Sequence, residues 1–297
     1  MMTVKGIDVS KYQGNVDFNK VKAAGYDFVI LNAGYGRYLN QKDPYFDSNY
    51  EKAQAAGLGI GAYWYSYAVN EAQAKEEARV FLEAVGDRRF SYPLCFDIED
   101  KTQSGLSQAV IGKMINAFCG YLEEKGYYAA IYSYADFLKN KVPVACRSRY
   151  DVWVAHFGVS KPSYPYAYGM WQYSSAGKVS GISGDCDLDY AYKDYPAIMK
   201  SKGLNGYEKA GSKVLDESGF REGDKSLGVL AMKELLILAR ERGLIGGNFE
   251  EHETFGSGTK KAVNALLKAW GYKENGIAGE KFIVRLRKEI SPLEVRS

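Results

Sequence analysis

The sequence predicts an α/β protein: an irregular TIM-like barrel of five βα units followed by three strands, and then a small all-α domain. Eight short apolar segments bounded by turn residues occur in the first 200 residues, and the first five each precede a candidate helix. Strands that alternate with helices form a parallel sheet, and eight of them suggest a closed barrel. Of the 25 tyrosines, all but Tyr207 and Tyr272 lie before residue 201. This shift in composition predicts a second domain.

The expected elements follow from the spacing of apolar residues. The strands are expected at 4–8, 27–33, 59–65, 92–98, 127–133, 151–156, 168–173 and 185–191. Helices are expected, among others, at 17–25, 45–57 and 71–86. In the third of these, one face carries Ala74, Ala78, Phe81, Leu82 and Val85. The last three strands follow one another too closely for full helices, so we expect degenerate repeats there.

The chain is expected to divide into a barrel at 1–200, a linker at 201–213 and a helical domain at 214–297. The linker segment is rich in Gly, Ser and Lys and has no apolar periodicity. Two helices are expected beyond it. One has an apolar face formed by Val263, Leu266, Leu267 and Trp270, and the other has a broader face formed by Leu227, Leu230, Leu235 and Leu238.

Composition excludes several classes of protein. The 39 basic and 36 acidic residues leave a net charge of +3, and no run of Lys or Arg could follow a phosphate backbone, so no nucleic-acid partner is expected. The four cysteines, Cys95, Cys119, Cys146 and Cys186, form no CxxC pair. They predict buried free thiols rather than a zinc site or a disulfide framework, and neither a metal nor a cofactor is expected.

The first residues, "MMTVKGIDVS", do not resemble a secretory signal, and no apolar stretch is long enough to span a membrane. We therefore expect a protein made soluble in the cytoplasm, with no membrane partner. A function outside the membrane would require release by another route.

The segment "YPLCFDIED", residues 92–100, ends an apolar strand with three acids. In a barrel of this kind, functional side chains gather at the carboxyl ends of the strands. Asp97 and Glu99 would project to one side there, about 7 Å apart by strand rise. Such a pair suits glycoside hydrolysis, in which one acid protonates the leaving oxygen and the other stabilises positive charge on the sugar. Glu99 is the candidate general acid.

Two further acids are expected in the same cleft. Asp8 ends the first strand and Asp187 lies in the last, and these strands are neighbours in a closed barrel. Clustered carboxylates cannot all ionise at little cost, so at least one should keep its proton near neutral pH. The alternative is that Asp8 is a turn residue and that Asp185, Asp187 and Asp189 form a solvated loop.

Aromatic clusters accompany the acids. "YWYSY" at 63–67 and "WQY" at 171–173 are more often core than ligand platform, but they fall at predicted strand ends, where aromatic faces can stack on sugar rings. No partner is expected for His156 or His252, and neither is expected to be catalytic.

These motifs, together with "DVSKYQGNVDFNKVKAAGYDFVILNAGYG", "AAIYSYADF", "VWVAHF" and "WQYSSAGKVSGISGDCDLDYAY", resemble the lysozymes of glycoside hydrolase family 25 over about residues 3–195. The resemblance implies a muramidase that cleaves the β-1,4 bond between N-acetylmuramic acid and N-acetylglucosamine of peptidoglycan. It implies Glu99 as proton donor with Asp97 as its partner. It also implies substrate contacts from Asp8, Asp187, Tyr63 and Tyr132, and Trp171 of the "WQY" cluster is a further candidate.

One departure from the family pattern is that Trp64 and Tyr65 follow Tyr63, where His-Phe is frequent. The mechanism of the second carboxylate stays open between direct attack, assistance to the acetamido group and activation of water. The segment 255–286 resembles a three-helix peptidoglycan-binding domain, with a plain dimerisation or packing module as the alternative.

A wall-degrading barrel without a recognisable secretory signal fits a phage endolysin released through a holin pore, which would act at the bacterial wall. A bacterial autolysin of the same chemistry and a non-catalytic wall-binding barrel are the alternatives. A chitinase-type hydrolase ranks lower, because "PLCFDIED" lacks the first aspartates of the DxxDxDxE signature.

Overall fold

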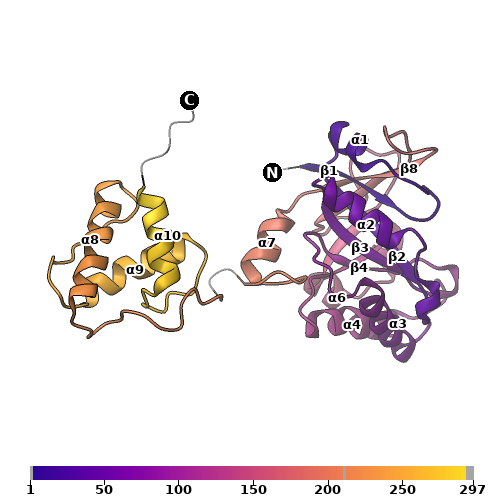
Figure 1. Cartoon of the computed structure of the whole chain (residues 1–297). Helices are drawn as coiled ribbons and strands as arrows, with labels where there is room; N and C mark the ends of the chain where they lie inside the picture. Colours follow the sequence, from indigo (N-terminus) through magenta and orange to yellow (C-terminus); the bar gives the residue numbers. More distant parts are fainter. Residues whose placement is uncertain (1–2, 210–211, 292–297) are drawn as a thin grey trace. The chain divides into compact units, whose positions relative to one another are not determined.

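The computed structural model describes residues 3–209 and 212–291, which form two compact units that divide after Tyr207. The first unit is a closed eight-stranded barrel with the strands in sequence order, and it confirms the predicted α/β barrel (Figure 1). The strands are β1 Val4–Val9, β2 Phe28–Tyr35, β3 Gly59–Tyr65, β4 Leu94–Asp97, β5 Ala129–Tyr134, β6 Asp151–Ala155, β7 Met170–Gly177 and β8 Cys186–Ala191.

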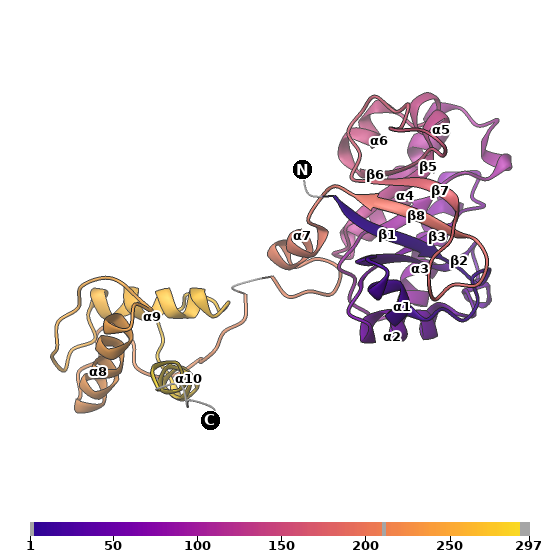
Figure 2. The same cartoon turned by 90° about the horizontal axis from the view of Figure 1, so that it is seen from above.

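The helices of this unit cover the outside of the barrel. They are α1 Phe18–Ala23, α2 Phe46–Ala55, α3 Glu71–Val85, α4 Gln108–Glu124, α5 Ala135–Asn140, α6 Val144–Arg149 and α7 Tyr195–Lys202, with 3-10 turns η1 Leu39–Gln41 and η2 Lys101–Gln103. Figure 2 shows α1 and α2 on one side of the barrel and α5 and α6 on the other. No helix in the described parts of the chain has the length and apolar character needed to cross a membrane.

Strand direction explains why no helix follows β7. Strands β1 to β7 each run parallel to the next in this series, whereas β8 runs antiparallel to both β7 and β1. An antiparallel neighbour can be reached by a hairpin, so no crossover helix is needed between β7 and β8. In consequence the first residues of β8 lie at the carboxyl end of β1, where Asp187 pairs with Asp8.

The barrel wall is apolar on both faces, as expected for a parallel sheet. In β2, Val29 and Leu31 pack into the core beneath the helices, and Phe28 and Ile30 pack into the barrel interior. The amino end of the barrel is filled by aromatic side chains, among them Tyr195 of α7. The carboxyl end is therefore the end that is available for a site.

The residues expected to begin a linker belong instead to the first unit. The segment 201–202 ends α7, and Asn205 is fully buried with a left-handed φ of 55°. The side chain of Asn205 accepts a hydrogen bond from Tyr128 N at 2.7 Å and donates one to Tyr92 O at 2.8 Å. These bonds pair two backbone groups of the barrel, Tyr128 N and Tyr92 O, that would otherwise lack a partner. They attach the segment after α7, up to Tyr207, to the barrel.

The second unit consists of three helices around a small core of its own. They are α8 Leu227–Glu241, α9 Ser257–Ala269 and α10 Glu280–Ile290. The buried side of α9 includes Val263, Leu266 and Leu267, in agreement with its pattern, while Trp270 is half-buried against Phe282 at a ring distance of 5.2 Å.

The face predicted for α8 is wrong. Leu227 is 73% exposed and Leu238 42%, and the helix buries Val229, Met232, Leu236 and Ala239 instead. The sequence is apolar almost all round this helix, so periodicity alone does not identify its inner face. Lys233, which is also buried, donates to the carbonyl oxygens of His252 and Thr254 and so attaches the loop before α9.

Candidate active site

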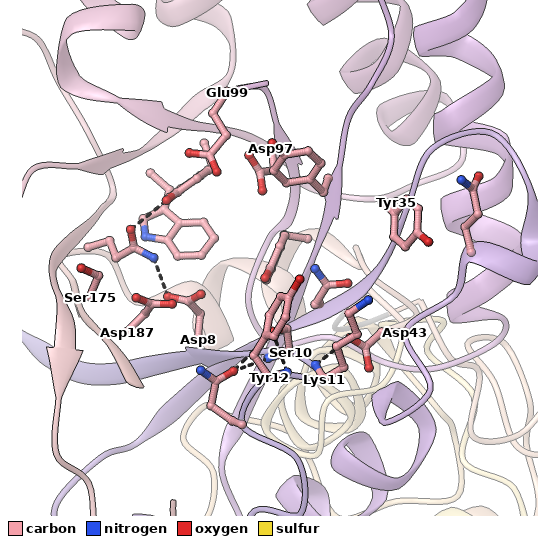
Figure 3. Close-up of a pocket in the computed structure, with 18 of the residues that line it drawn as sticks. Asp8, Ser10, Lys11, Tyr12, Tyr35, Asp43, Asp97, Glu99, Ser175 and Asp187 are labelled. Carbon is pink, nitrogen blue, oxygen red and sulfur yellow. Dashed lines mark hydrogen bonds between the residues drawn. The ribbon is translucent and has the colours of Figure 1, made fainter. Parts of the chain in front are cut away.

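A pocket of about 910 Å³ opens at the carboxyl end of the barrel. Four of its acids come from three strands or the loops that follow them: Asp8 from β1, Asp97 and Glu99 from β4 and its loop, and Asp187 from β8. Figure 3 shows these four carboxylates facing the same space. The structure therefore brings the four predicted acids together.

Asp97 and Glu99 carry the unsatisfied polar atoms of the pocket. Asp97 is the last residue of β4 and is buried, while Glu99 is half-buried in the loop. Asp97 Oδ1 and Glu99 Oε2 are buried oxygens with no hydrogen-bond partner among the residues that the structure describes. A buried acceptor without a partner is costly unless a ligand or a proton satisfies it.

Burial governs the proton affinity of this pair. It raises the pKa of Glu99 to about 7, with Asp187 and then Asp100 adding to the shift. Burial, followed by the nearby Glu99, also raises the pKa of Asp97 well above its usual value. The low dielectric disfavours both charges, and the Glu99 charge further disfavours that of Asp97, so the pair retains a proton near neutral pH.

A second group of acids lies across the pocket. Burial raises the pKa of Asp187 to about 6, and burial followed by Asp189 and Asp187 raises the pKa of Asp8 well above its usual value. Asp189 is fully buried, so the alternative that it belongs to a solvated loop is wrong. Burial raises the pKa of Asp189 to about 8. Of the three acids considered there, only Asp185 is exposed, and it pairs with Lys178 at 2.7 Å.

Hydrogen bonds connect Asp8 and Asp189 to aromatic side chains of neighbouring strands. Tyr132 donates to Gln172 Oε1 at 2.8 Å, and Gln172 Nε2 donates to Asp8 Oδ2 at 2.7 Å. The indole of Trp153 donates to Asp189 Oδ1 at 2.8 Å and packs against Tyr132 with a ring distance of 4.4 Å. These contacts fix the orientation of side chains that face the pocket.

Both predicted tyrosines, Tyr63 and Tyr132, line the pocket, but Trp171 does not. Neighbouring residues of a strand point to opposite faces, and in β7 it is Gln172 that faces the pocket. Trp171 packs against Tyr173 at 5.8 Å and donates to His156 O at 2.9 Å. Trp171 is therefore corrected from a pocket residue to a packing residue.

The departure after Tyr63 has two structural consequences. Trp64 is completely buried in the barrel wall, where its indole donates to Gly36 O at 2.9 Å. Tyr65 lines the pocket and donates to Asp100 Oδ2 at 3.2 Å. The substitution thus changes the pocket wall at Tyr65, while the acids remain in place.

A buried network supports the loop that carries Glu99. Glu77 of α3 accepts from Ser66 Oγ at 2.6 Å and from Tyr67 N at 3.0 Å. Gln103 Nε2 donates to Ser66 O at 3.1 Å, and Gln103 Oε1 accepts from Asp100 N at 3.0 Å. Burial raises the pKa of Glu77 to about 7. The network therefore joins the loop after β3 to the loop after β4.

The sequence analysis missed Gln172, Asp189 and Trp153. Strand alternation could have identified Asp189, since it shares a face with Asp187, whereas the cross-barrel bonds of Gln172 and Trp153 have no local signal. Neither His156 nor His252 lines the pocket. Contrary to expectation, His252 has a partner, because its Nε2 lies 3.0 Å from Glu250 Oε2; His252 and Glu250 are exposed side chains of the second unit. Within the described residues, no group of three or more His, Cys, Asp or Glu side chains is arranged to hold a metal ion. All four cysteines are buried and free, as predicted.

Comparison with known proteins identifies relatives of the barrel. Residues 7–182 match the family described as Glycosyl hydrolases family 25. The autolytic lysozyme of Clostridium acetobutylicum is 34% identical over 186 residues, which are 63% of this chain and 55% of that protein. Lysozyme M1 of Streptomyces globisporus is 34% identical over 200 residues, which are 62% of this chain and 66% of that protein. The chain thus spans less than two thirds of each of these relatives.

A solved structure has the same fold. The bacterial lysozyme from Streptomyces coelicolor superposes with a TM-score of 0.59 at 30% identity, and the match covers 68% of this chain and 97% of that one.

Proposed function

The chain belongs to glycosyl hydrolases family 25, and from this premise we propose that it is a lysozyme acting on peptidoglycan. The bond cleaved would be the β-1,4 bond between N-acetylmuramic acid and N-acetylglucosamine. The observation that supports this proposal best is the buried pair Asp97 and Glu99, each with an unpartnered oxygen in the pocket. A non-catalytic barrel could use such oxygens to bind a ligand, but it would have no use for the proton that the pair retains near neutral pH.

Glu99 is proposed as the general acid. Its pKa of about 7 lets it hold a proton at neutral pH and release it to the glycosidic oxygen as the bond breaks. Asp97, beneath it at the end of β4, would stabilise the positive charge that develops on the sugar. Asp8, Asp187, Tyr63 and Tyr132 would then contact the sugar from the other strands, in keeping with their positions in the pocket.

The test is a digestion of purified peptidoglycan followed by reduction of the products and identification of the new sugar end by mass spectrometry. A reduced N-acetylmuramic acid end is expected. Glu99→Gln keeps the shape of the side chain but cannot donate a proton, so its rate should fall by about 10²–10⁴-fold. Glu124→Gln, a change on the outer helix α4, is the matched control and should cut normally. A well-folded Glu99→Gln protein with the wild-type rate would contradict the assignment.

We further propose that the second unit binds the bacterial wall and that the chain acts there as a phage endolysin. A tethered binder raises the effective concentration of the barrel at a polymeric substrate. The second unit has its own core, as a separate binding module requires. A fluorescent fusion of residues 208–297 should therefore sediment with purified walls. A folded fusion that stays in the supernatant would favour a packing or dimerisation module.

A bacterial autolysin of the same chemistry is the alternative biological role. The two roles differ in how the protein reaches the wall. Expression of the chain inside bacteria with and without a holin separates them, since an endolysin lyses the cells only when the holin is present. Lysis in the absence of the holin would favour the autolysin.

A further inference from the structure

The pocket contains a cationic corner that the proposed chemistry does not use. Lys11 and Lys42 are the two basic side chains in the described lining of the pocket. Lys42 is already paired, with Asp47 at 2.7 Å, and lies over the ring of Phe46. Lys11 has no carboxylate within ion-pair distance among the residues that the structure describes.

Two tyrosines flank the Lys11 ammonium. Lys11 Nζ lies 5.5 Å from the ring centroid of Tyr12 and 5.8 Å from that of Tyr35. Tyr12 is 84% exposed and Tyr35 37%, so both rings are open to a ligand. A cation over aromatic faces is held in position without losing its charge. Figure 3 shows Tyr12, Lys11 and Tyr35 on the side of the pocket away from Glu99.

The backbone under this corner is fixed by a buried acid. Asp43, 7% exposed, accepts from Lys11 N through Oδ2 and from Tyr45 N through Oδ1, both at 2.8 Å. In this way Asp43 connects the loop after β1 to the loop after β2. Its carboxylate is occupied by backbone donors, while the Lys11 ammonium points into an open cleft. The loop is therefore organised before a ligand arrives, which reduces the entropy lost on binding.

The charges in the pocket favour one kind of ligand at this corner. Apart from the two lysines, the titratable carboxyl groups of the lining are Asp8, Asp43, Asp97, Glu99 and Asp187. Four of them surround the site of bond cleavage, where an anionic group on the substrate would be repelled. An anionic group would be attracted at Lys11 instead. Peptidoglycan supplies such groups as the carboxylates of its stem peptide, or as the lactyl carboxylate where the peptide is missing.

We propose that Lys11, held between Tyr12 and Tyr35 above Asp43, forms a subsite for a carboxylate of the peptidoglycan substrate. The inference rests on the proposed lysozyme function and deepens it. A carboxylate bound here orients the glycan strand in the cleft, with its anionic substituent away from the acids. Because the contact forms equally in the bound substrate and in the transition state, its loss should raise KM and leave kcat unchanged.

The test uses soluble glycan fragments in three forms: with stem peptides, with the peptide carboxylates methyl-esterified, and freed of peptides. Initial rates of reducing-end formation give kcat and KM for each form. Lys11→Gln should raise KM about 3–10-fold on unmodified fragments, a range typical of a partly exposed charge pair, and 0.5 M salt should reduce this effect. Lys11→Arg keeps the charge and should stay within about twofold of wild type. Lys113→Gln removes an equally exposed lysine on α4, outside the pocket, and should match wild type.

If the bound carboxylate is on the peptide, Lys11→Gln and wild type should have the same KM on esterified fragments. If it is the lactyl carboxylate, which is free only where the peptide is missing, the difference in KM should appear on peptide-free glycan alone. Equal KM values for Lys11→Gln and Lys113→Gln on all three forms would overturn the subsite. Failure of wild type to release reducing ends from any form would instead contradict the proposed function, so the two failures are distinguishable.

Discussion

Hydrolysis should be lost as the pH rises through 7, because the carboxylates of the pocket then lose the proton that the reaction needs. With a pKa of about 7 for Glu99, about 90% of the molecules carry the proton at pH 6 and about 10% at pH 8. The value of kcat/KM should therefore fall about tenfold across this interval. The rate falls rather than rises with pH because the protonated form of Glu99 is the active one. The raised pKa keeps that form present to higher pH than in an exposed glutamate.

Two substitutions identify the source of this decline. Asp187→Asn removes the second-largest cause of the Glu99 shift, so the pKa of Glu99 should fall and the decline should move to lower pH. Asp185→Asn removes an exposed acid two residues earlier in the chain and is the matched control, which should leave the profile in place. The measurement is kcat/KM on soluble glycan fragments between pH 4 and pH 9, with circular dichroism at each end.

A histidine origin is the competing explanation, since histidine also titrates in this range. The double variant His156→Gln with His252→Gln should keep the decline, because neither ring lines the pocket. A profile that stays flat up to pH 9 in this double variant would refute the reasoning. Equal profiles for Asp187→Asn and wild type would also count against it.

Three further predictions concern the groups around the site. Glu77→Gln should lower kcat by about 10-fold with little change in KM. With its oxygen on Tyr67 N, the amide turns its donor toward Ser66 Oγ, which already accepts from Ala68 N, and this conflict loosens the loop that carries Glu99. An unchanged kcat would show that the network is structural only. Asp189→Asn should raise the melting temperature relative to wild type by an amount that is near zero at pH 4, grows as the pH rises to about 8 and is constant above it. The reason is that the wild-type fold loses stability between the ordinary aspartate pKa of about 4 and the folded pKa of about 8. A gap independent of pH would contradict the titration. Asn205→Ala leaves two buried backbone groups unpaired and should cost at least about 2 kcal/mol in urea unfolding, whereas Asn15→Ala, an exposed change, should cost almost nothing.

The barrel was predictable because each strand is a local apolar pattern. The segment 59–65 was expected as a strand and is β3, and the helix expected at 71–86 is α3, Glu71–Val85. The direction of β8 was not predictable from such patterns, because nothing in 185–191 distinguishes a strand that returns by hairpin from one that follows a crossover. That direction nevertheless decides which residues of β8 reach the pocket.

The predicted site was incomplete for a related reason. Asp8, Asp97, Glu99 and Asp187 stand at strand ends that the sequence reveals, and the structure places all four in the pocket. Trp171 was misassigned because the face of a strand depends on its register, and a shift of one residue exchanges its two faces. The catalytic and binding roles of these residues remain predictions, and the experiments above test them.

Buried acids occur at both ends of this barrel, and their hydrogen-bond partners distinguish the two ends. At the amino end, the side chain of Asp151 is 3% exposed and is fully engaged, by the hydroxyls of Tyr128 at 3.0 Å and Tyr195 at 2.8 Å and by Lys193 Nζ at 2.9 Å. At the carboxyl end, Asp97 and Glu99 each retain a buried oxygen without a partner in the described residues. A carboxylate that only stabilises the fold should have its partners supplied by the fold, because an unsatisfied one costs about 1–3 kcal/mol or more. Asp189 also has a buried oxygen without a partner, but it does not line the pocket, and its pKa of about 8 lets a proton occupy it. Among the acids that line the pocket, Asp97 and Glu99 are therefore the ones whose partner is expected to come from outside the protein.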